Sequence, residues 1–156
     1  LIKNKDIDIL GSNARLINEN DENIGLSNLP LLHEDIVKKL NTNCPIFHPS
    51  VIFKFNVWRN LDGYDNSLNR AQDFDLWRRC RDHGFIFHNL KSFEIDYRLK
   101  RHSKTIKGAT RNLIAILRLS WKHNDLILFL YAFIDFAKNI LIALRLYKPK
   151  TFKIKV

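Results

Sequence analysis

The stretch from Gly63 to Trp77 constrains the fold of this chain more than any other. It begins with a Gly-Tyr-Asp turn, continues through a polar loop and enters Gln72-Asp73-Phe74-Asp75, where two acidic residues precede an apolar face. Carboxylates in the first turn of a helix are stabilised by its exposed N–H groups and by its dipole. The pattern therefore predicts a turn followed by a helix over about residues 71–83 that buries Phe74 and Trp77.

The rest of the chain reads as short strands and helices, which together predict the α/β class. Alternating acidic and apolar residues predict a half-buried strand at 6–11, and a β-branched and aromatic run predicts a buried strand at 50–55. Residues 18–23 are polar and predict a hairpin or loop. The remaining expected elements are helices at 32–40, 56–61, 105–123 and 126–147, and strands at 85–88 and 94–98.

Charge is distributed unevenly along the 156 residues, whose formal net charge is +10. Residues 1–97 contain 12 Lys and Arg and 14 Asp and Glu, whereas residues 98–156 contain 14 Lys and Arg and only 2 Asp and Glu. This basic C-terminal third predicts an anionic partner: membrane headgroups, nucleic acid or a phosphate-bearing substrate. The composition itself, 46% hydrophobic and 27% charged, is that of a globular protein and excludes a disordered chain.

Two further features concern the origin of the chain. Cys44 and Cys80 lie far apart without metal-ligand spacing, so we expect free thiols in a reducing compartment. The chain contains no methionine and opens within a helix-like segment, so we expect it to be the C-terminal part of a longer protein.

The segment 126–147 has the length of a transmembrane helix, but polar residues interrupt it. These are Asp135, Lys138, Asn139 and Arg145. Because a charge at the bilayer centre is costly, the pattern favours a helix that lies in the membrane interface, flanked by the C-terminal lysines. A helix that packs on its own domain or on a partner protein is the alternative, and a true span is the least favoured.

Five short motifs follow one another along the chain, and their order and spacing resemble those of a known enzyme family. They are His48-Pro49-Ser50, Asp62-Gly63-Tyr64-Asp65, Gln72-Asp73-Phe74-Asp75-Leu76-Trp77, Tyr97-Arg98 and His102-Ser103. From about Ile7 to Lys107 the chain is similar to the second half of the catalytic domain of family 2 glycosyltransferases. The resemblance implies an incomplete GT-A-like mixed sheet with flanking helices over residues 1–104, the acceptor-side half of that domain. Residues 105–156 would then be a basic tail of two amphipathic helices, for which we expect membrane association.

The resemblance also assigns roles to individual residues. Asp73 corresponds to the catalytic base, and Gln72 stands where the family has an acidic residue, which removes a charge. The implied substrate-binding residues are His48, Tyr64, Asp65, Gln72, Trp77 and Arg98. Arg98 could pair with a donor phosphate or form a structural ion pair with Asp96 or Asp65. His102 could serve a metal or a phosphate, and Asp75 is expected to be structural.

The activity implied by the resemblance is transfer of a sugar, with inversion, from a nucleotide-diphosphate donor to an acceptor hydroxyl. The acceptor would be a saccharide or a lipid-linked saccharide, in bacterial surface polysaccharide or glycolipid synthesis. The Asp-x-Asp motif that holds the divalent metal, Mn or Mg, is missing from its usual place, so we expect this chain alone to be inactive. We expect the protein to be cytoplasmic, peripheral at the inner face of the cell membrane, and to bind an anionic membrane surface but no nucleic acid.

A second hypothesis makes the chain a non-enzymatic basic module. Residues 98–156 would then bind nucleic acid, a membrane or a partner helix. With nucleic acid, aromatic residues such as Trp121, Phe129 and Phe133 would stack on the bases. Those aromatic residues cluster on the most apolar helix, away from most of the basic charge, which favours a core or membrane role for them.

Overall fold

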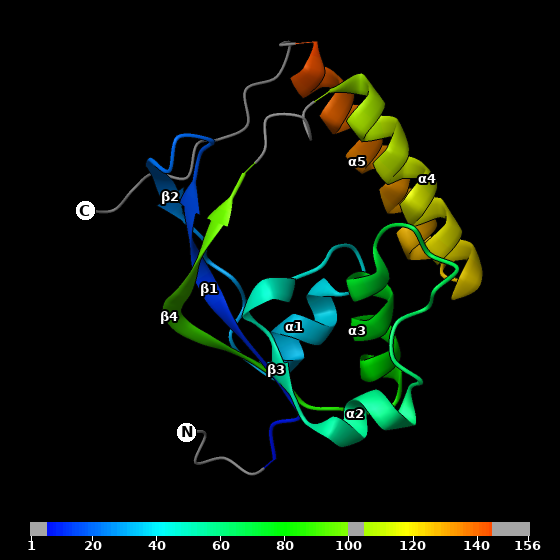
Figure 1. The fold of residues 1–156 in the computed structure, drawn as a ribbon. Coiled ribbons are helices and arrows are strands. Elements are labelled where there is room, and N and C mark those ends of the chain that lie inside the picture. Colours follow the sequence, from blue (N-terminus) through cyan, green and yellow to red (C-terminus); the bar gives the residue numbers. More distant parts are fainter. Residues whose placement is uncertain (1–5, 100–104, 145–156) are drawn as a thin grey trace. The chain divides into compact units, whose positions relative to one another are not determined.

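The structure is a computed structural model that describes residues 6–99 and 105–144 (Figure 1). The chain divides into two compact units: residues 1–16 with 26–97, and residues 17–25 with 98–156. The described residues form a mixed α/β structure, as the sequence predicts.

Four strands and five α-helices make up the described part of the chain. The strands are β1 (Ile9–Ile17), β2 (Asn23–Leu26), β3 (Ile52–Phe53) and β4 (Phe87–Arg98). The helices are α1 (His33–Lys39), α2 (Phe55–Asn60), α3 (Gln72–Asp82), α4 (Ile106–Lys122) and α5 (Leu126–Ala143), and a short 3-10 turn covers His48–Ser50.

Strand β1 is the central strand of the sheet. The strand order is β2-β1-β3, and β4 also pairs with β1. Strand β3 is antiparallel to β1, with Ile9 opposite Phe53. Along β4 the hydrogen bonds advance in the same direction as along β1: the Ile9 N–H donates to the Ile86 carbonyl, and the Asn13 side chain donates to the Leu90 carbonyl. The sheet is therefore mixed, and β1 lies inside it.

Three sequence predictions about the strands are wrong. The first strand is not half-buried: Ile9 through Ala14 are all buried, so the side chains on both faces of β1 are covered. The segment 50–55 contributes only the two-residue strand β3, and Ile52 is 70% exposed. The strands expected at 85–88 and 94–98 are one continuous strand, β4. Local sequence pattern cannot show what covers each face of a strand, which decides its burial, or how far its partner strand extends, which decides its length.

The predicted central helix is confirmed as α3, which is buried on nearly all sides. Phe74, Leu76, Trp77 and Cys80 are at most 6% exposed and form much of the core. Asp75 and Arg78 on the same helix are also buried, and the Arg78 side chain donates to the Leu40 carbonyl at 2.9 Å. The buried residues of α3 therefore include polar as well as apolar ones.

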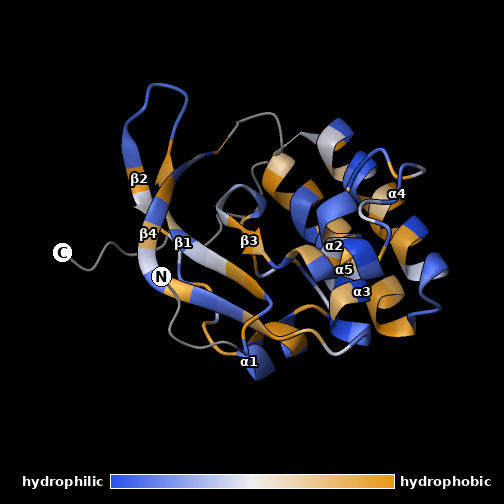
Figure 2. Cartoon of the chain, turned by 60° about the horizontal axis from the view of Figure 1, so that its bottom comes forward, coloured by the Kyte–Doolittle hydropathy of each residue, from blue (hydrophilic) through white to orange (hydrophobic). Residues whose placement is uncertain are grey.

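In the second unit, the polar segment after β1 forms the predicted hairpin tip (Figure 2). The Asn18 N–H donates to the Glu22 carbonyl at 3.0 Å, and Asp21 has a positive φ of 64°. Arg98 binds this tip: it donates to the Asn18 carbonyl at 2.7 Å and pairs with the Asp21 carboxylate. Helices α4 and α5 pack against each other and are joined by a three-residue turn, 123–125.

We expect Gly63→Ala to lower the free energy of unfolding by about 2–4 kcal/mol. Gly63 has φ +67°, and an added Cβ would lie 2.4 Å from the Trp58 ring. Gly84→Ala is the matched control, because Gly84 has φ +75° but no atom lies within 4 Å of the added Cβ. The control should lose only about 1 kcal/mol, from backbone strain. Urea denaturation of both variants measures the difference; equal losses would show that Trp58 moves aside without penalty.

Candidate active site

A pocket of about 640 Å³ opens on the first unit at the N-terminus of α3. Its walls come from three segments: the 3-10 turn, the turn and loop that follow Gly63, and the first turn of α3. The lining residues are His48, Tyr64, Asp65, Asn66, Leu68, Asn69, Gln72 and Asp73. Five of the residues that the sequence singled out therefore lie around one pocket: His48, Tyr64, Asp65, Gln72 and Asp73.

Asp73 lies in the first turn of α3 and not at its N-cap. The N-cap residue is Ala71, in the left-handed conformation with φ 60°, and it makes no side-chain cap. One oxygen of the Asp73 carboxylate, Oδ1, accepts a hydrogen bond from the Phe74 N–H at 2.9 Å. The other oxygen is not used in that bond, and the carboxylate forms part of the pocket wall. The Asp73 carboxylate therefore accepts one backbone N–H of the first turn and also lines the pocket.

The turn that carries Tyr64 is held in place from behind by α3. Arg79 pairs with the fully buried Asp75 at 2.8 Å, one turn earlier on the helix. The other two guanidinium nitrogens of Arg79 donate to the carbonyls of Leu61 and Gly63, each at 2.7 Å. The expectation that Asp75 is structural agrees with this geometry. A planar guanidinium has donors on three nitrogens and can reach a carboxylate and two separate carbonyls at once, whereas the three donors of lysine lie on one nitrogen.

Tyr64 and His48 form a polar pair on the wall of the pocket. The Tyr64 hydroxyl lies 2.6 Å from Nε2 of His48, and the Tyr64 ring packs edge-on against Trp58 at 5.2 Å. Burial raises the pKa of the Tyr64 phenol, and the nearby Asp73 carboxylate raises it further. The phenol therefore stays protonated at neutral pH and can act as a hydrogen-bond donor.

The loop after Tyr64 is ordered by Asp65. The Asp65 carboxylate accepts a hydrogen bond from the Ser67 N–H at 2.8 Å, and its carbonyl accepts one from the Leu68 N–H at 3.2 Å. This side chain-to-backbone bond is a typical Asx turn. Asn66 and Asn69 on the same loop are exposed and offer amide groups at the pocket mouth. Asp65 thus shapes the loop as well as lining the pocket.

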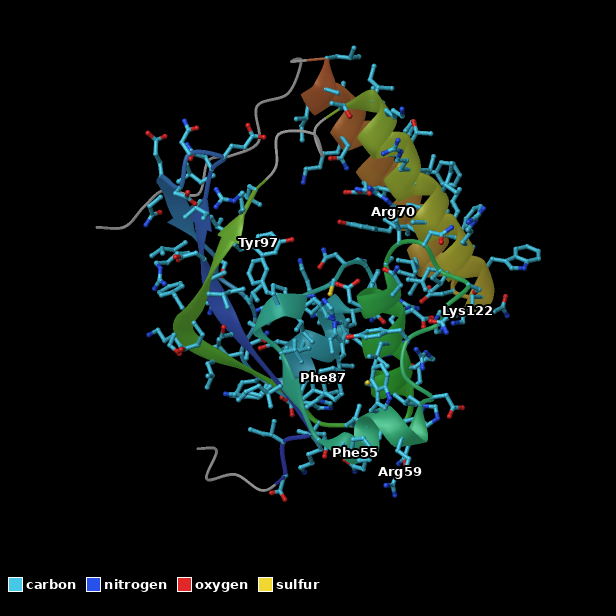
Figure 3. All side chains as sticks on the ribbon, in the orientation of Figure 1. Phe55, Arg59, Arg70, Phe87, Tyr97 and Lys122 are labelled. Atoms are coloured by element: carbon cyan, nitrogen blue, oxygen red, sulfur yellow. The ribbon has the colours of Figure 1, made fainter. Side chains whose placement is uncertain are left out.

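Two predicted site residues, Trp77 and Arg98, do not line the pocket. Trp77 is fully buried, with its ring 6.4 Å from that of His48, so it supports the site from the core and does not contact a ligand directly. Arg98 is bound to Asp21 of the hairpin tip, and not to Asp96 or Asp65. Asp96 instead pairs with Arg15. His102 lies outside the described residues. Tyr97, the neighbour of Arg98, packs on Phe47 at 4.7 Å (Figure 3).

Several residues around the site could not be identified from the sequence. Asn66, Leu68 and Asn69 lie in a polar loop whose sequence gave no indication of which side chains would face a pocket. Cys44 is a free thiol, as predicted, and burial raises its pKa to about 12, with a further contribution from Asp73. The charge of Asp73 thus acts on both Cys44 and Tyr64, although these residues are distant in sequence.

The pocket combines two carboxylates, three amides, a phenol and an imidazole, and none of its eight lining residues is Lys or Arg. Such groups can donate and accept hydrogen bonds with several hydroxyls at once, and a carboxylate can accept a proton. Within residues 6–99 and 105–144, no group of three His, Cys, Asp or Glu could hold a metal ion. In comparisons with known proteins, no protein family matches the chain and no curated protein does.

Proposed function

We propose that this chain is the acceptor-binding part of an inverting glycosyltransferase of family 2 with a GT-A-like fold, with Asp73 as the catalytic base. The observation that carries the proposal is the pocket that gathers His48, Tyr64, Asp65, Gln72 and Asp73 at the start of α3. These residues come from three separate segments that the motif resemblance had already singled out. An accidental resemblance gives no reason for them to lie around one pocket.

The chemistry of the pocket suits a sugar acceptor. Amide and carboxylate groups are well matched to the several hydroxyls of a saccharide, and a site built to bond hydroxyls rejects ligands that lack them. Nucleotide diphosphates are usually held by arginine or lysine, by backbone N–H groups or by a cation. The absence of Lys and Arg from the pocket lining thus supports an acceptor and argues against a donor diphosphate there.

In the proposed reaction, the acceptor hydroxyl lies against the Asp73 carboxylate, and its oxygen attacks the anomeric carbon of the donor sugar. The new oxygen–carbon bond forms on the face opposite the phosphate, so the configuration inverts. The bond from the anomeric carbon to phosphate breaks, and the nucleoside diphosphate leaves with the electron pair. The hydroxyl proton passes to Asp73. Tyr64 and His48 orient the acceptor through hydrogen bonds, since their polar atoms lie together on the pocket wall.

The donor site and its divalent metal, Mn or Mg, are assigned to residues that this chain does not contain. Calorimetric titration with uridine and guanosine diphosphates in the presence of Mn²⁺ tests this assignment. The 156-residue chain should bind neither nucleotide, whereas a form extended N-terminally in its natural reading frame should bind one of them. If the extended form binds no nucleoside diphosphate, the proposal is wrong. If the short chain binds one tightly, the donor site lies within it and must be reassigned.

A further inference from the structure

Helix α5 is inverted in polarity compared with a helix of a water-soluble protein. Asp135 and Asn139 are polar residues of α5 that are only partly exposed. They bond to each other: the Asn139 Nδ2 donates to an Asp135 carboxylate oxygen at 2.9 Å. The exposed side of the helix is almost wholly apolar instead. The exposed large apolar residues of α5 are Leu126, Ile127, Phe129, Leu130, Phe133, Ile134 and Leu141.

The exposed side of α5 is apolar over its first nine residues, and Lys138 is the one exposed charged residue of the helix. Leu126, Leu130 and Ile134 are 69%, 55% and 65% exposed, and they recur at the spacing of one helix turn. The helix is the one described segment that is long and apolar enough to cross a membrane, and only 11% of it is buried. In water this arrangement is unfavourable, because apolar surface remains hydrated while polar groups are withdrawn. An apolar environment outside the helix removes that conflict.

Helix α4 carries a different exposed side, which is basic and aromatic. Its exposed basic residues are Lys107, Arg111, Arg118 and Lys122, distributed from the first turn to the last. Ile114 and Trp121 lie among them and are 47% and 88% exposed. Figure 3 labels Lys122, near the turn that leads into α5. Interleaved basic and aromatic residues of this kind are typical of helices that lie among lipid headgroups.

We propose that the α4–α5 hairpin binds an anionic membrane surface, with the exposed apolar side of α5 in the acyl boundary and the basic side of α4 at the headgroups. The hairpin lies in the plane of the membrane and does not span it. The charged residues of α4 extend along most of the helix against which α5 packs, so a span would carry them through the hydrocarbon core.

The charges around the hairpin favour a lipid surface over a protein partner or a second copy of the chain. The described residues 105–144 contain five Lys and Arg and two Asp, and four more lysines follow in the sequence. Two copies that met through their hairpins would each bring this excess of positive charge, which opposes their association. An anionic lipid surface satisfies both the apolar side of α5 and the basic side of α4.

Vesicle co-flotation with the 156-residue chain tests the proposal. Binding to vesicles with 30 mol% phosphatidylserine should exceed binding to pure phosphatidylcholine by more than about tenfold and should fall with added salt. The double variant Leu130→Glu/Ile134→Glu should lose at least about tenfold of the binding. Both side chains are exposed on α5, so the variant should keep its circular dichroism spectrum.

The matched control is Ile52→Glu/Phe55→Glu, which adds the same two charges at apolar residues that are 70% and 68% exposed on the first unit (Figure 3). It should bind vesicles like the unsubstituted chain. Three results would overturn the proposal. The first is an equal loss of vesicle binding in both double variants. The second is that the chain binds single-stranded RNA and not vesicles. The third is that the chain does not bind vesicles but forms a dimer in sedimentation, and that the Leu130→Glu/Ile134→Glu variant is monomeric. Failure of the membrane proposal would not change the result expected from the nucleotide titration of the proposed transferase.

Discussion

Replacing Asp73 by asparagine should slow sugar transfer by the N-terminally extended protein by about 10²–10⁴-fold. The amide keeps the size and the hydrogen-bonding reach of the side chain, but it cannot accept the proton that the acceptor hydroxyl must lose. The helix should be unaffected, because the oxygen that accepts the Phe74 N–H remains. Donor affinity, measured by calorimetry, should be unchanged, since the pocket wall that contains Asp73 is assigned to the acceptor.

The control for this variant is Asp82→Asn, the same substitution at the opposite end of α3. Asp82 pairs with Arg81 and does not line the pocket. Initial rates of nucleoside diphosphate release with acceptor present compare the two variants with the unsubstituted enzyme. Transfer at the normal rate by Asp73→Asn would remove Asp73 from the chemistry. An equal loss in Asp82→Asn would show that charge on the helix, and not the position of Asp73, matters.

We expect Arg79→Met to lower the free energy of unfolding by about 3–5 kcal/mol. The variant keeps much of the length of the side chain but removes the Arg79 guanidinium that pairs with the fully buried Asp75. It also removes the donors to the Leu61 and Gly63 carbonyls, so the turn that carries Tyr64 loses its attachment to α3. Arg79→Lys should recover only part of the loss, because an ammonium cannot reproduce three directed bonds.

Urea denaturation measures the loss of stability, and Arg81→Met is the control. Arg81 lies on the same helix and pairs with Asp82, whose side chain is 46% exposed, so water can replace the lost partner. The control should lose about 1 kcal/mol. If both variants lose equally, the buried pair contributes no more than a surface pair. A normal thermal melt for Arg79→Met would likewise contradict the role of Arg79 as the anchor of the turn.

The candidate site shows how far local sequence information reaches. The polar loop and the helix after Gly63 could be predicted because turn residues and helix periodicity act over a few neighbouring residues. That His48 would join them could be suggested only by motif order, and the structure brings its ring within hydrogen-bonding distance of Tyr64. Trp77 and Arg98 show the limit: the same motif order named them, yet Trp77 is in the core and Arg98 binds the hairpin tip.

The sequence by itself determined the α/β class, the position of α3, the polar hairpin tip and the existence of two C-terminal helices, because each depends on periodicity and turn chemistry within one segment. Only the tertiary structure decided that β1 is buried on both sides, that Arg79 anchors the turn before the pocket, and which side of α5 is exposed. These features depend on contacts between residues far apart in the chain. Burial and hydrogen-bond partners at such contacts are set by the packing of whole elements, which no local pattern specifies.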